Sequence, residues 1–106
     1  VTSSETIYNN IPLFKPLCER AGIPIYAYGR NAVEHGAVAA LASDYYLMID
    51  TLIVPMALRV LRDGISPGDM PAAFLEENLM FLNLSEAEKL GIQIPEAILQ
   101  QAAEVY

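Results

Sequence analysis

The sequence has one cysteine, one histidine and no tryptophan among its 106 residues. A single cysteine, Cys18, excludes an internal disulfide framework and a cysteine-rich metal site. The apolar neighbours of Cys18 favour a buried thiol over a reactive nucleophile. His35 stands beside one carboxylate, Glu34, and adjacent side chains rarely chelate one ion, so we expect no metal site. We expect His35 to be a surface or loop residue, with a ligand contact or a catalytic role as the alternatives.

Basic residues are also scarce. Six Lys and Arg stand against 13 Asp and Glu, which gives a formal net charge of −7. Nucleic acid binding needs basic side chains to neutralise phosphates, so this charge argues against a nucleic acid partner. The few basic residues are scattered and form no stripe that would bind a membrane surface.

Long uninterrupted apolar runs are absent, although 54% of the residues are hydrophobic. The most apolar stretch, 45–61, is broken by Asp50, Pro55 and Arg59, whereas a membrane span needs roughly 20 apolar residues. We therefore expect the apolar surface to be buried by dimerisation or against the rest of a longer chain. The first residues show no signal peptide and no methionine, so we expect the true start to lie upstream or to have been removed.

Motifs for catalysis and phosphate binding are missing. The glycines fit neither G-x-G-x-x-G nor the P-loop, and no G-x-S-x-G supports a triad. Glu76 and Glu77 are expected to be a solvated pair, which is weak evidence for acid–base chemistry. The sequence therefore predicts a protein that binds something without transforming it and needs no cofactor.

The first helix is expected to begin behind Ser3 or Ser4 as N-cap and to end at Gly22. Pro12 and Pro16, four residues apart, imply a kink or two helical pieces. The 3.6-residue spacing predicts a buried face made of Phe14, Leu17, Cys18 and Ala21.

Three later segments have strand composition, and they are 23–28, 37–42 and 79–83. We expect a turn at 29–31, a short helical turn at 32–35, a loop at 66–71, and helices at 44–63, 85–91 and 96–105. The helix 44–63 is expected to be capped by Ser43 or Asp44 and to bend at Pro55. The helix 85–91 opens with a Ser85–Glu88 capping box, and Pro95 suits the N1 position of the last helix. One face of the helix 44–63 is predicted to carry Tyr46, Ile49, Ile53, Ala57, Val60 and Leu61.

Strands that alternate with helices predict one α/β domain over 1–106 with parallel strand pairing. Ligands of such sheets bind at the carboxyl ends of the strands, on the loops that lead into helices. These loops are expected at 3–6, 28–31 and 43–45, and we expect them to converge on one rim. Their candidate ligand-binding residues are Ser3, Ser4, Thr6, Tyr28, Arg30, Asn31, Asp44 and Tyr45.

Two of these candidates carry charge. The guanidinium of Arg30 can clamp a carboxylate in two hydrogen bonds, and the alternative is a solvated arginine. Asp44 can accept from an ammonium group beside the ring of Tyr45. The alternative is that Asp44 only caps its helix and Tyr46 packs in the core.

Five segments, in their order and spacing, resemble the C-terminal part of the substrate-binding proteins of ABC transporters. These segments are AGIPIYAY at 21–28, VEHGAVAALASDYY at 33–46, RVLRDG at 59–64, DMP at 69–71 and FLNLSEAEKLGIQIPEAIL at 81–99. The resemblance covers nearly the whole chain. It implies a fragment of the type I periplasmic-binding fold, with a layered, parallel-sheet, Rossmann-like lobe.

The function implied by the resemblance is that of a non-enzymatic receptor of an ABC importer. It would bind a small polar ligand, amino-acid-like or carboxylate-bearing, between two lobes. Its expected partners are that ligand, the transporter permease and the missing lobe of the same chain, with self-association of the fragment. It would be periplasmic or extracellular, held at the membrane by the transporter or by an upstream lipid anchor.

The chain departs from the family pattern at several positions. Ser3-Ser4-Glu5 replaces a Thr-Asp-Asn-like run, Tyr28–Asn31 replaces a loop that usually carries Ser or Asp, and Ala42 replaces a Gly. The segment 47–55 replaces small glycines and is one residue longer. These changes imply an altered ligand preference or lobe interface.

A free-standing regulatory module of flavodoxin-like shape is the alternative from another class. A phospho-receiver should carry an acidic cluster at one strand end and a lysine at another. Neither Lys15 nor Lys89 ends a predicted strand, which disfavours this alternative. An enzyme ranks third because no nucleophile and base set is present.

Overall fold

The computed structural model describes residues 5–106, which divide into two compact units. Unit 1 combines the chain up to Ala42 with Leu79–Tyr106, and unit 2 is Ser43–Asn78. The single domain predicted from the sequence spans both units and stays a prediction. Ser3 and Ser4, expected as N-cap and as ligand contacts, lie outside the described residues.

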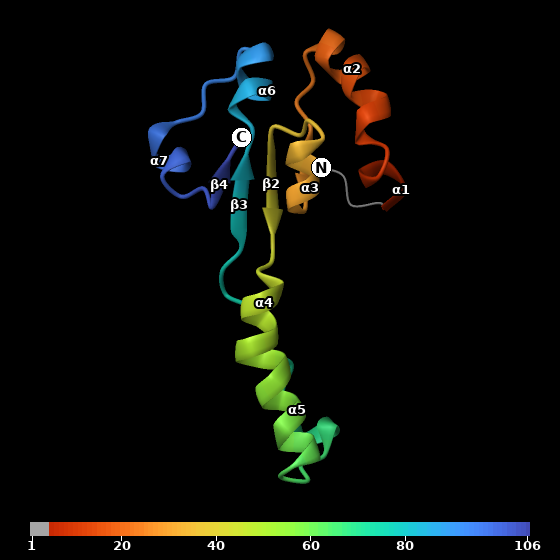
Figure 1. The fold of residues 1–106 in the computed structure, drawn as a ribbon, viewed down its shortest axis with the longest axis vertical. Coiled ribbons are helices and arrows are strands. Elements are labelled where there is room, and N and C mark those ends of the chain that lie inside the picture. The colour runs from red at the N-terminus through yellow and green to blue at the C-terminus, as the bar shows by residue number, and fades with distance from the viewer. Residues whose placement is uncertain (1–4) are drawn as a thin grey trace. The chain divides into compact units, whose positions relative to one another are not determined.

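Unit 1 is built on a four-stranded sheet in the order β1-β2-β3-β4 (Figure 1). The strands are β1 (Tyr26–Tyr28), β2 (Ala39–Ala42), β3 (Leu79–Leu82) and β4 (Glu104–Val105). β1 with β2 and β3 with β4 are parallel, but β2 and β3 are antiparallel. The α/β class is confirmed, and the predicted parallel pairing holds for β1 with β2 and β3 with β4 but is wrong for β2 with β3. The reason is that the chain leaves the sheet after Ala42 and re-enters at its pairing partner Leu79, so β3 runs back along β2.

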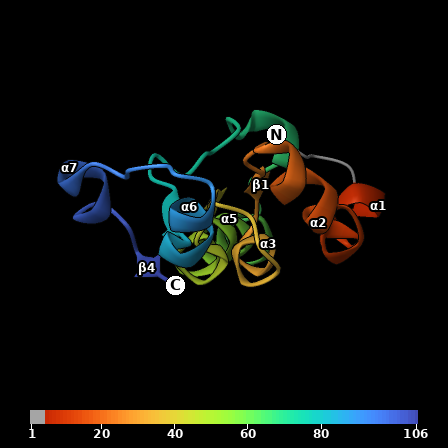
Figure 2. The ribbon, with the colours of Figure 1, turned by 90° about the horizontal axis from the view of Figure 1, so that it is seen from above.

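Five short helices accompany this sheet, and across Figures 1 and 2 they follow the order α7, α6, α3, α2, α1. They are α1 (Glu5–Tyr8), α2 (Ile11–Ala21), α3 (Arg30–Glu34), α6 (Leu84–Lys89) and α7 (Glu96–Leu99). The expected break in the first helix exists, but it lies between α1 and α2, before both prolines. The helix predicted at 96–105 is wrong beyond Leu99, because Glu104 and Val105 pair with β3 as a strand.

The core of unit 1 lies on the side of the sheet that carries α2 and α3. One cluster joins Ile11, Ile25, Ala27, Ala32 and Ala37, and the other joins Val33, Ala40, Ala42 and Phe81. The inner row of α2 starts at Ile11 and continues through Phe14 and the half-buried Cys18. Leu17 and Ala21 were predicted on this face but are exposed: Leu17 lies to one side of the row that Ile11 begins, and Ala21 is the last residue of the helix. The C-terminal stop at Gly22 is confirmed, with its backbone left-handed at φ 66°.

A charged network links α2 to α6 within this core. The Glu86 side chain is 6% exposed, and its Oε1 lies 3.0 Å from Lys15 Nζ and 2.6 Å from Lys89 Nζ. Lys15 Nζ also lies 3.0 Å from Glu19 Oε1. A buried carboxylate is tolerated when it is paired and hydrogen-bonded, as Glu86 is here. This network therefore fixes the first turn of α6 against α2.

The capping box predicted at Ser85 and Glu88 is wrong. Asn83 is the N-cap, and its Oδ1 accepts from the Glu86 backbone N–H at 2.9 Å. Asn83 Nδ2 also donates to the Val33 carbonyl at 3.0 Å, which ties the cap to α3. Asn shares the N-cap preference of Ser, so the sequence offered two caps two residues apart, and the contact with Val33 favours the first.

Replacing Asn83 with alanine should therefore lower the free energy of unfolding by about 1–2 kcal/mol. Both the cap and the bridge to α3 are lost in this variant. Ser85→Ala is the matched control and should change stability little, because Ser85 lies inside α6 and is exposed. Denaturant unfolding of the two variants measures this, and equal losses would contradict the assigned cap.

Unit 2 consists of one long helix and a returning segment. The helix runs as α4 (Tyr45–Met48), a π-helical turn η1 (Ile49–Ile53) and α5 (Val54–Leu61), and a 3₁₀ turn η2 (Pro67–Asp69) follows. The Val54 N–H donates to the Ile49 carbonyl and closes this π turn, which ends before Pro55. The bend expected at Pro55 stays a prediction. A π turn has i→i+5 hydrogen bonds in place of the i→i+4 bonds of an α-helix.

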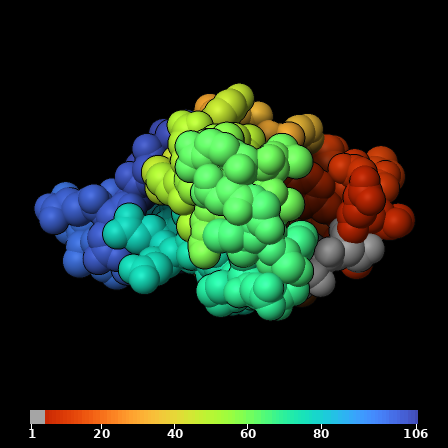
Figure 3. Space-filling view, turned by 90° about the horizontal axis from the view of Figure 1, so that it is seen from below, coloured from red at the N-terminus to blue at the C-terminus, as the bar shows by residue number. Residues whose placement is uncertain are grey.

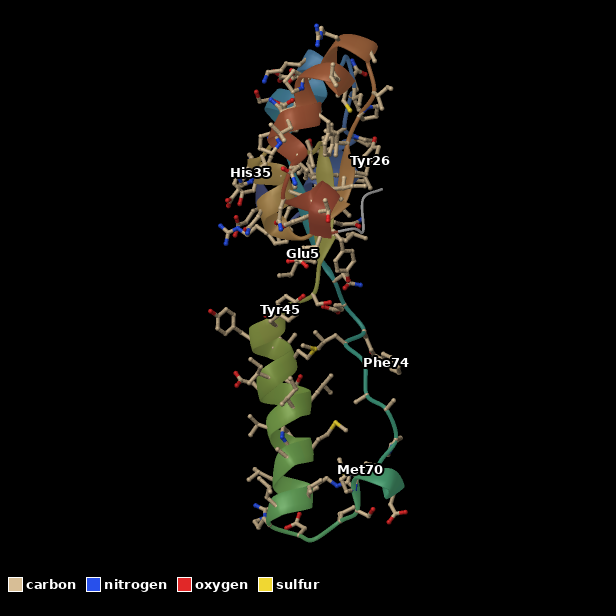
Figure 4. All side chains as sticks on the ribbon, turned by 90° about the vertical axis from the view of Figure 1, so that its right-hand side faces the viewer. Glu5, Tyr26, His35, Tyr45, Met70 and Phe74 are labelled. Atoms are coloured by element: carbon tan, nitrogen blue, oxygen red, sulfur yellow. The ribbon has the colours of Figure 1, made fainter. Side chains whose placement is uncertain are left out.

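The apolar side chains of this helix are largely exposed in unit 2 (Figure 4). Figure 3 shows the space-filling surface of this unit, coloured from yellow-green to teal. Tyr46 is 85% exposed and Leu61 84%, so the alternative that Tyr46 packs in the core is wrong. The returning segment, with Met70 and Phe74, runs beside one side of the helix only (Figure 4). No helix among residues 5–106 has the length and hydropathy needed to cross a bilayer.

Candidate functional site

The candidate site begins where β1 and β2 end. These two strands are parallel, so both reach the same edge of the sheet, at Tyr28 and Ala42. The Gly29 backbone N–H donates to the Leu41 carbonyl at 2.7 Å and fixes the start of the loop at this edge. Loops at the carboxyl ends of parallel strands are where α/β sheets bind ligands.

The helix α1, which carries Thr6, lies beside the loop 28–31 at this edge. Gly29 has φ 101°, and a Cβ on it would lie 2.9 Å from Tyr8 Oη. Tyr8 of α1 therefore packs directly over the loop, and Thr6 lies on the same one-turn helix. Tyr8 could not be predicted here from the sequence, because only the tertiary contact with Gly29 brings it to this loop.

Arg30 is engaged with the far strand of the sheet. Its Nε donates to Tyr106 Oη at 2.9 Å, and its Nη2 lies 2.9 Å from Glu104 Oε2. Nε also lies 3.5 Å from Glu34 Oε1. The guanidinium is 52% exposed but not simply solvated, so a ligand carboxylate would compete with Glu34 and Glu104 for it.

The same contacts explain the electrostatics of the cluster. The hydrogen bond with Tyr106 and the charge of Glu104 raise the pKa of Arg30 above its ordinary value. The Arg30 hydrogen bond alone would lower the pKa of Tyr106, but desolvation and the bonds to Glu104 and Glu34 outweigh it, so this pKa is raised. Arg30 and Tyr106 therefore both stay protonated at neutral pH.

Asn31 and His35 lie one helical turn apart on α3. His35 is exposed, and its Nδ1 donates to the Asn31 carbonyl at 2.6 Å. The surface position expected for His35 is confirmed. Across residues 5–106, no three His, Cys, Asp or Glu side chains gather as metal ligands would.

Asp44 and Tyr45 belong to unit 2, where they open the long helix. Asp44 is the N-cap, and its Oδ1 accepts from the Leu47 backbone N–H at 2.9 Å. Tyr45 is 63% exposed. The capping interpretation of Asp44 is confirmed, and convergence of this third loop with the other two stays a prediction.

The face of the sheet opposite α3 is apolar and largely open. Figure 4 places Tyr26 on this side and His35 on the other. Tyr26, Tyr28 and Leu41 are each at least 42% exposed. A shallow hollow of about 220 Å³ lies here, lined by Tyr26, Val38, Ala39, Met80, Leu82, Ile92, Gln93, Ile94, Pro95 and Ile98. This hollow is apolar and lacks the charged groups of the loop edge.

We expect the 106-residue chain on its own to self-associate through this sheet face and the helix of unit 2, because both expose large apolar side chains. Leu41→Asp should weaken the association, whereas Leu13→Asp, a control at an exposed position on α2, should not. Sedimentation velocity at several concentrations measures this. A monomer that persists at all concentrations would contradict the expectation.

Three solved structures are similar to this chain over 97% of its length. A conserved domain protein from Vibrio cholerae has 29% identity and a TM-score of 0.75, with 34% of that chain covered. An ABC domain in complex with L-Trp from Streptococcus pneumoniae has 30% identity and a TM-score of 0.72, with 35% covered. A ligand-free, open substrate-binding protein with adhesive properties from Clostridium difficile, at 22% identity, TM-score 0.71 and 34% covered, supports the fold alone. The chain thus spans about a third of the length of these structures.

The fold expected from the sequence, a lobe of the periplasmic-binding type, is confirmed by these neighbours. No protein with a curated description is similar enough to count as a relative. The model of the family of ABC transporter substrate-binding proteins matches residues 1–106, which is the whole chain. With this match, the chain belongs to the family of ABC transporter substrate-binding proteins.

Proposed function

We propose that the complete protein is the extracytoplasmic solute receptor of an ABC importer and that it binds an amino-acid-like ligand. Family membership supports the solute-binding role and a transporter as partner. The structural observation that carries the proposal is the polar loop 28–31 at the shared end of β1 and β2, packed against α1. The neighbour bound to L-Trp, at 30% identity, supports an amino acid as the ligand class.

The ligand site would be formed by the three loops that the sequence analysis singled out. Its proposed contact residues are Ser3, Ser4, Thr6, Tyr28, Asn31, Asp44 and Tyr45. Arg30, the eighth candidate, is engaged with Glu104 and Tyr106. Hydroxyl and amide groups of this set can bind the ligand carboxylate, and Asp44 can accept from its ammonium group. Tyr8, which packs on Gly29, adds a phenol beside the same loop.

The mechanism would be closure of two lobes around the bound solute. A ligand shifts a two-state equilibrium only by its difference in affinity for the two states. A ligand that touches loops from both lobes binds the closed state more tightly, and so it populates that state. No step in this mechanism makes or breaks a covalent bond, in keeping with a receptor that is not an enzyme.

Asp44→Asn in the complete protein tests the proposed ammonium site. Asn keeps the helix cap that Asp44 provides, so this variant removes the charge and spares the fold. Loss of a charge-assisted hydrogen bond should weaken binding of L-amino acids by roughly tenfold or more. Calorimetry against a panel of L-amino acids, beginning with L-tryptophan, measures the change.

The matched control is Asp69→Asn in the 3₁₀ turn of unit 2, which should leave affinity unchanged. Equal affinities of the Asp44 variant and the unmodified protein would remove Asp44 from the site. If no amino acid binds even the unmodified protein, the proposed ligand class is wrong.

A further inference from the structure

We propose that Arg30 is a positioning residue, which clasps the start of α3 to the C-terminal strand β4 and thereby holds the loop 28–31 in place. The inference rests on the proposed function, because it assigns a role within the loop that we take to contact the ligand. From the sequence, the Arg30 guanidinium was expected to bind a ligand carboxylate. In the structure it binds Glu104 and Tyr106 instead.

The start of α3 needs an anchor from outside the helix. α3 has only five residues, and its N-cap is Gly29, which offers no side chain to accept from the first backbone N–H groups. Short helices are marginal without tertiary contacts. Arg30, the first residue of α3, supplies such a contact by reaching Tyr106 and Glu104.

The strand β4 also has few backbone hydrogen bonds to hold it. It has two residues and pairs with β3 only, as the last strand in the sheet order. Its backbone is held by the Tyr106 N–H to the Leu82 carbonyl and by the Ala103 N–H to the Met80 carbonyl, each at 2.8 Å. The side chains of Glu104 and Tyr106 add the only polar link among the described contacts that joins β4 to α3.

The cluster depends on Arg30 for its charge balance. Tyr106 Oη lies 2.8 Å from Glu104 Oε2 and 3.1 Å from Glu34 Oε1, but one hydroxyl proton serves only one carboxylate at a time. Without the guanidinium, two carboxylates would face one phenol and repel each other. Loss of Arg30 should therefore open the clasp and release both α3 and β4.

Amide hydrogen exchange on the complete protein tests the clasp without any ligand. Arg30→Gln should speed exchange at the amides of Gly29, Ala32 and Tyr106 by roughly threefold to tenfold, through local opening. Glu104→Gln should act in the same direction more weakly. Arg62→Gln, at an exposed arginine paired with Asp63, is the control and should leave these amides unchanged. Unchanged exchange in Arg30→Gln would overturn the proposal.

A ligand-binding measurement distinguishes a positioning role of Arg30 from direct contact with the ligand. The distinction lies in whether Glu104→Gln weakens or tightens binding. With L-tryptophan and L-tryptophanamide as probes, Arg30→Gln and Glu104→Gln should both weaken binding, and to similar extents for the two probes. If Arg30 instead bound the ligand carboxylate, Glu104→Gln would free it and tighten binding of the acid alone, which would overturn the proposal. If neither probe binds, the proposed ligand class fails while the exchange result still decides the clasp.

Discussion

Replacing Gly36 with alanine is expected to destabilise unit 1 by about 2–4 kcal/mol. Gly36 has φ 108°, a backbone conformation that residues with a Cβ rarely adopt, and a Cβ there would lie 2.2 Å from Lys15 Cε. Lys15 cannot simply move aside, because its ammonium group is held by Glu86 and Glu19. The substitution therefore combines backbone strain with disruption of a largely buried ion pair.

Gly22→Ala is the matched control for this prediction. Gly22 also has a positive φ, of 66°, but nothing lies within 4 Å of the position of its Cβ. It should cost only the backbone strain, about 1 kcal/mol. Denaturant unfolding of the two variants separates backbone strain from crowding. Equal losses in the free energy of unfolding would show that crowding against Lys15 adds nothing to the strain.

Acidification should weaken the fold through Glu86. Burial opposes ionisation of this carboxyl, but hydrogen bonds from Lys89 and Lys15 outweigh it and keep its pKa below the ordinary value. The stabilisation is thus present above the unfolded pKa of about 4.3 and is lost as pH falls through the lower, folded pKa. Glu86→Gln removes the charge at every pH, so it should cost about 1–3 kcal/mol at pH 7 and much less in acid.

Unfolding curves of the unmodified protein and Glu86→Gln, recorded from neutral to acidic pH, measure this convergence. Glu88→Gln, at an exposed position on the same helix, is the control and should follow the unmodified protein throughout. A constant gap between the unmodified protein and Glu86→Gln at all pH values would contradict the role given to the carboxylate.

Local signals in the sequence predicted much of unit 1. The β-rich segments at 23–28 and 37–42 contain β1 and β2, and Gly22 ends α2 as its αL preference dictates. The errors occur where tertiary contacts decide between local options. Residues 96–105 have helical character, yet pairing with β3 makes a strand of Glu104 and Val105. The bond from Asn83 to Val33, fifty residues away, likewise decided between two good caps.

In the candidate site, too, the features set by local sequence could be predicted and those set by distant contacts could not. Strand ends can be placed from the sequence, so Tyr28 and the loop after it were found. The partners of Arg30 were not found, because Glu104 and Tyr106 lie more than seventy residues away in the chain. The buried role of Lys15 was missed as well, since a charged residue between Pro12 and Pro16 gives no local sign that Glu86 will pair with it.

The most direct test of the account is a crystal structure of the complete protein with the amino acid that calorimetry identifies. We expect the ligand between two lobes, in contact with residues of the loops 28–31 and 43–45. The Arg30 guanidinium should remain on Glu104 and Tyr106. A ligand bound away from loops 28–31 and 43–45 would contradict the account.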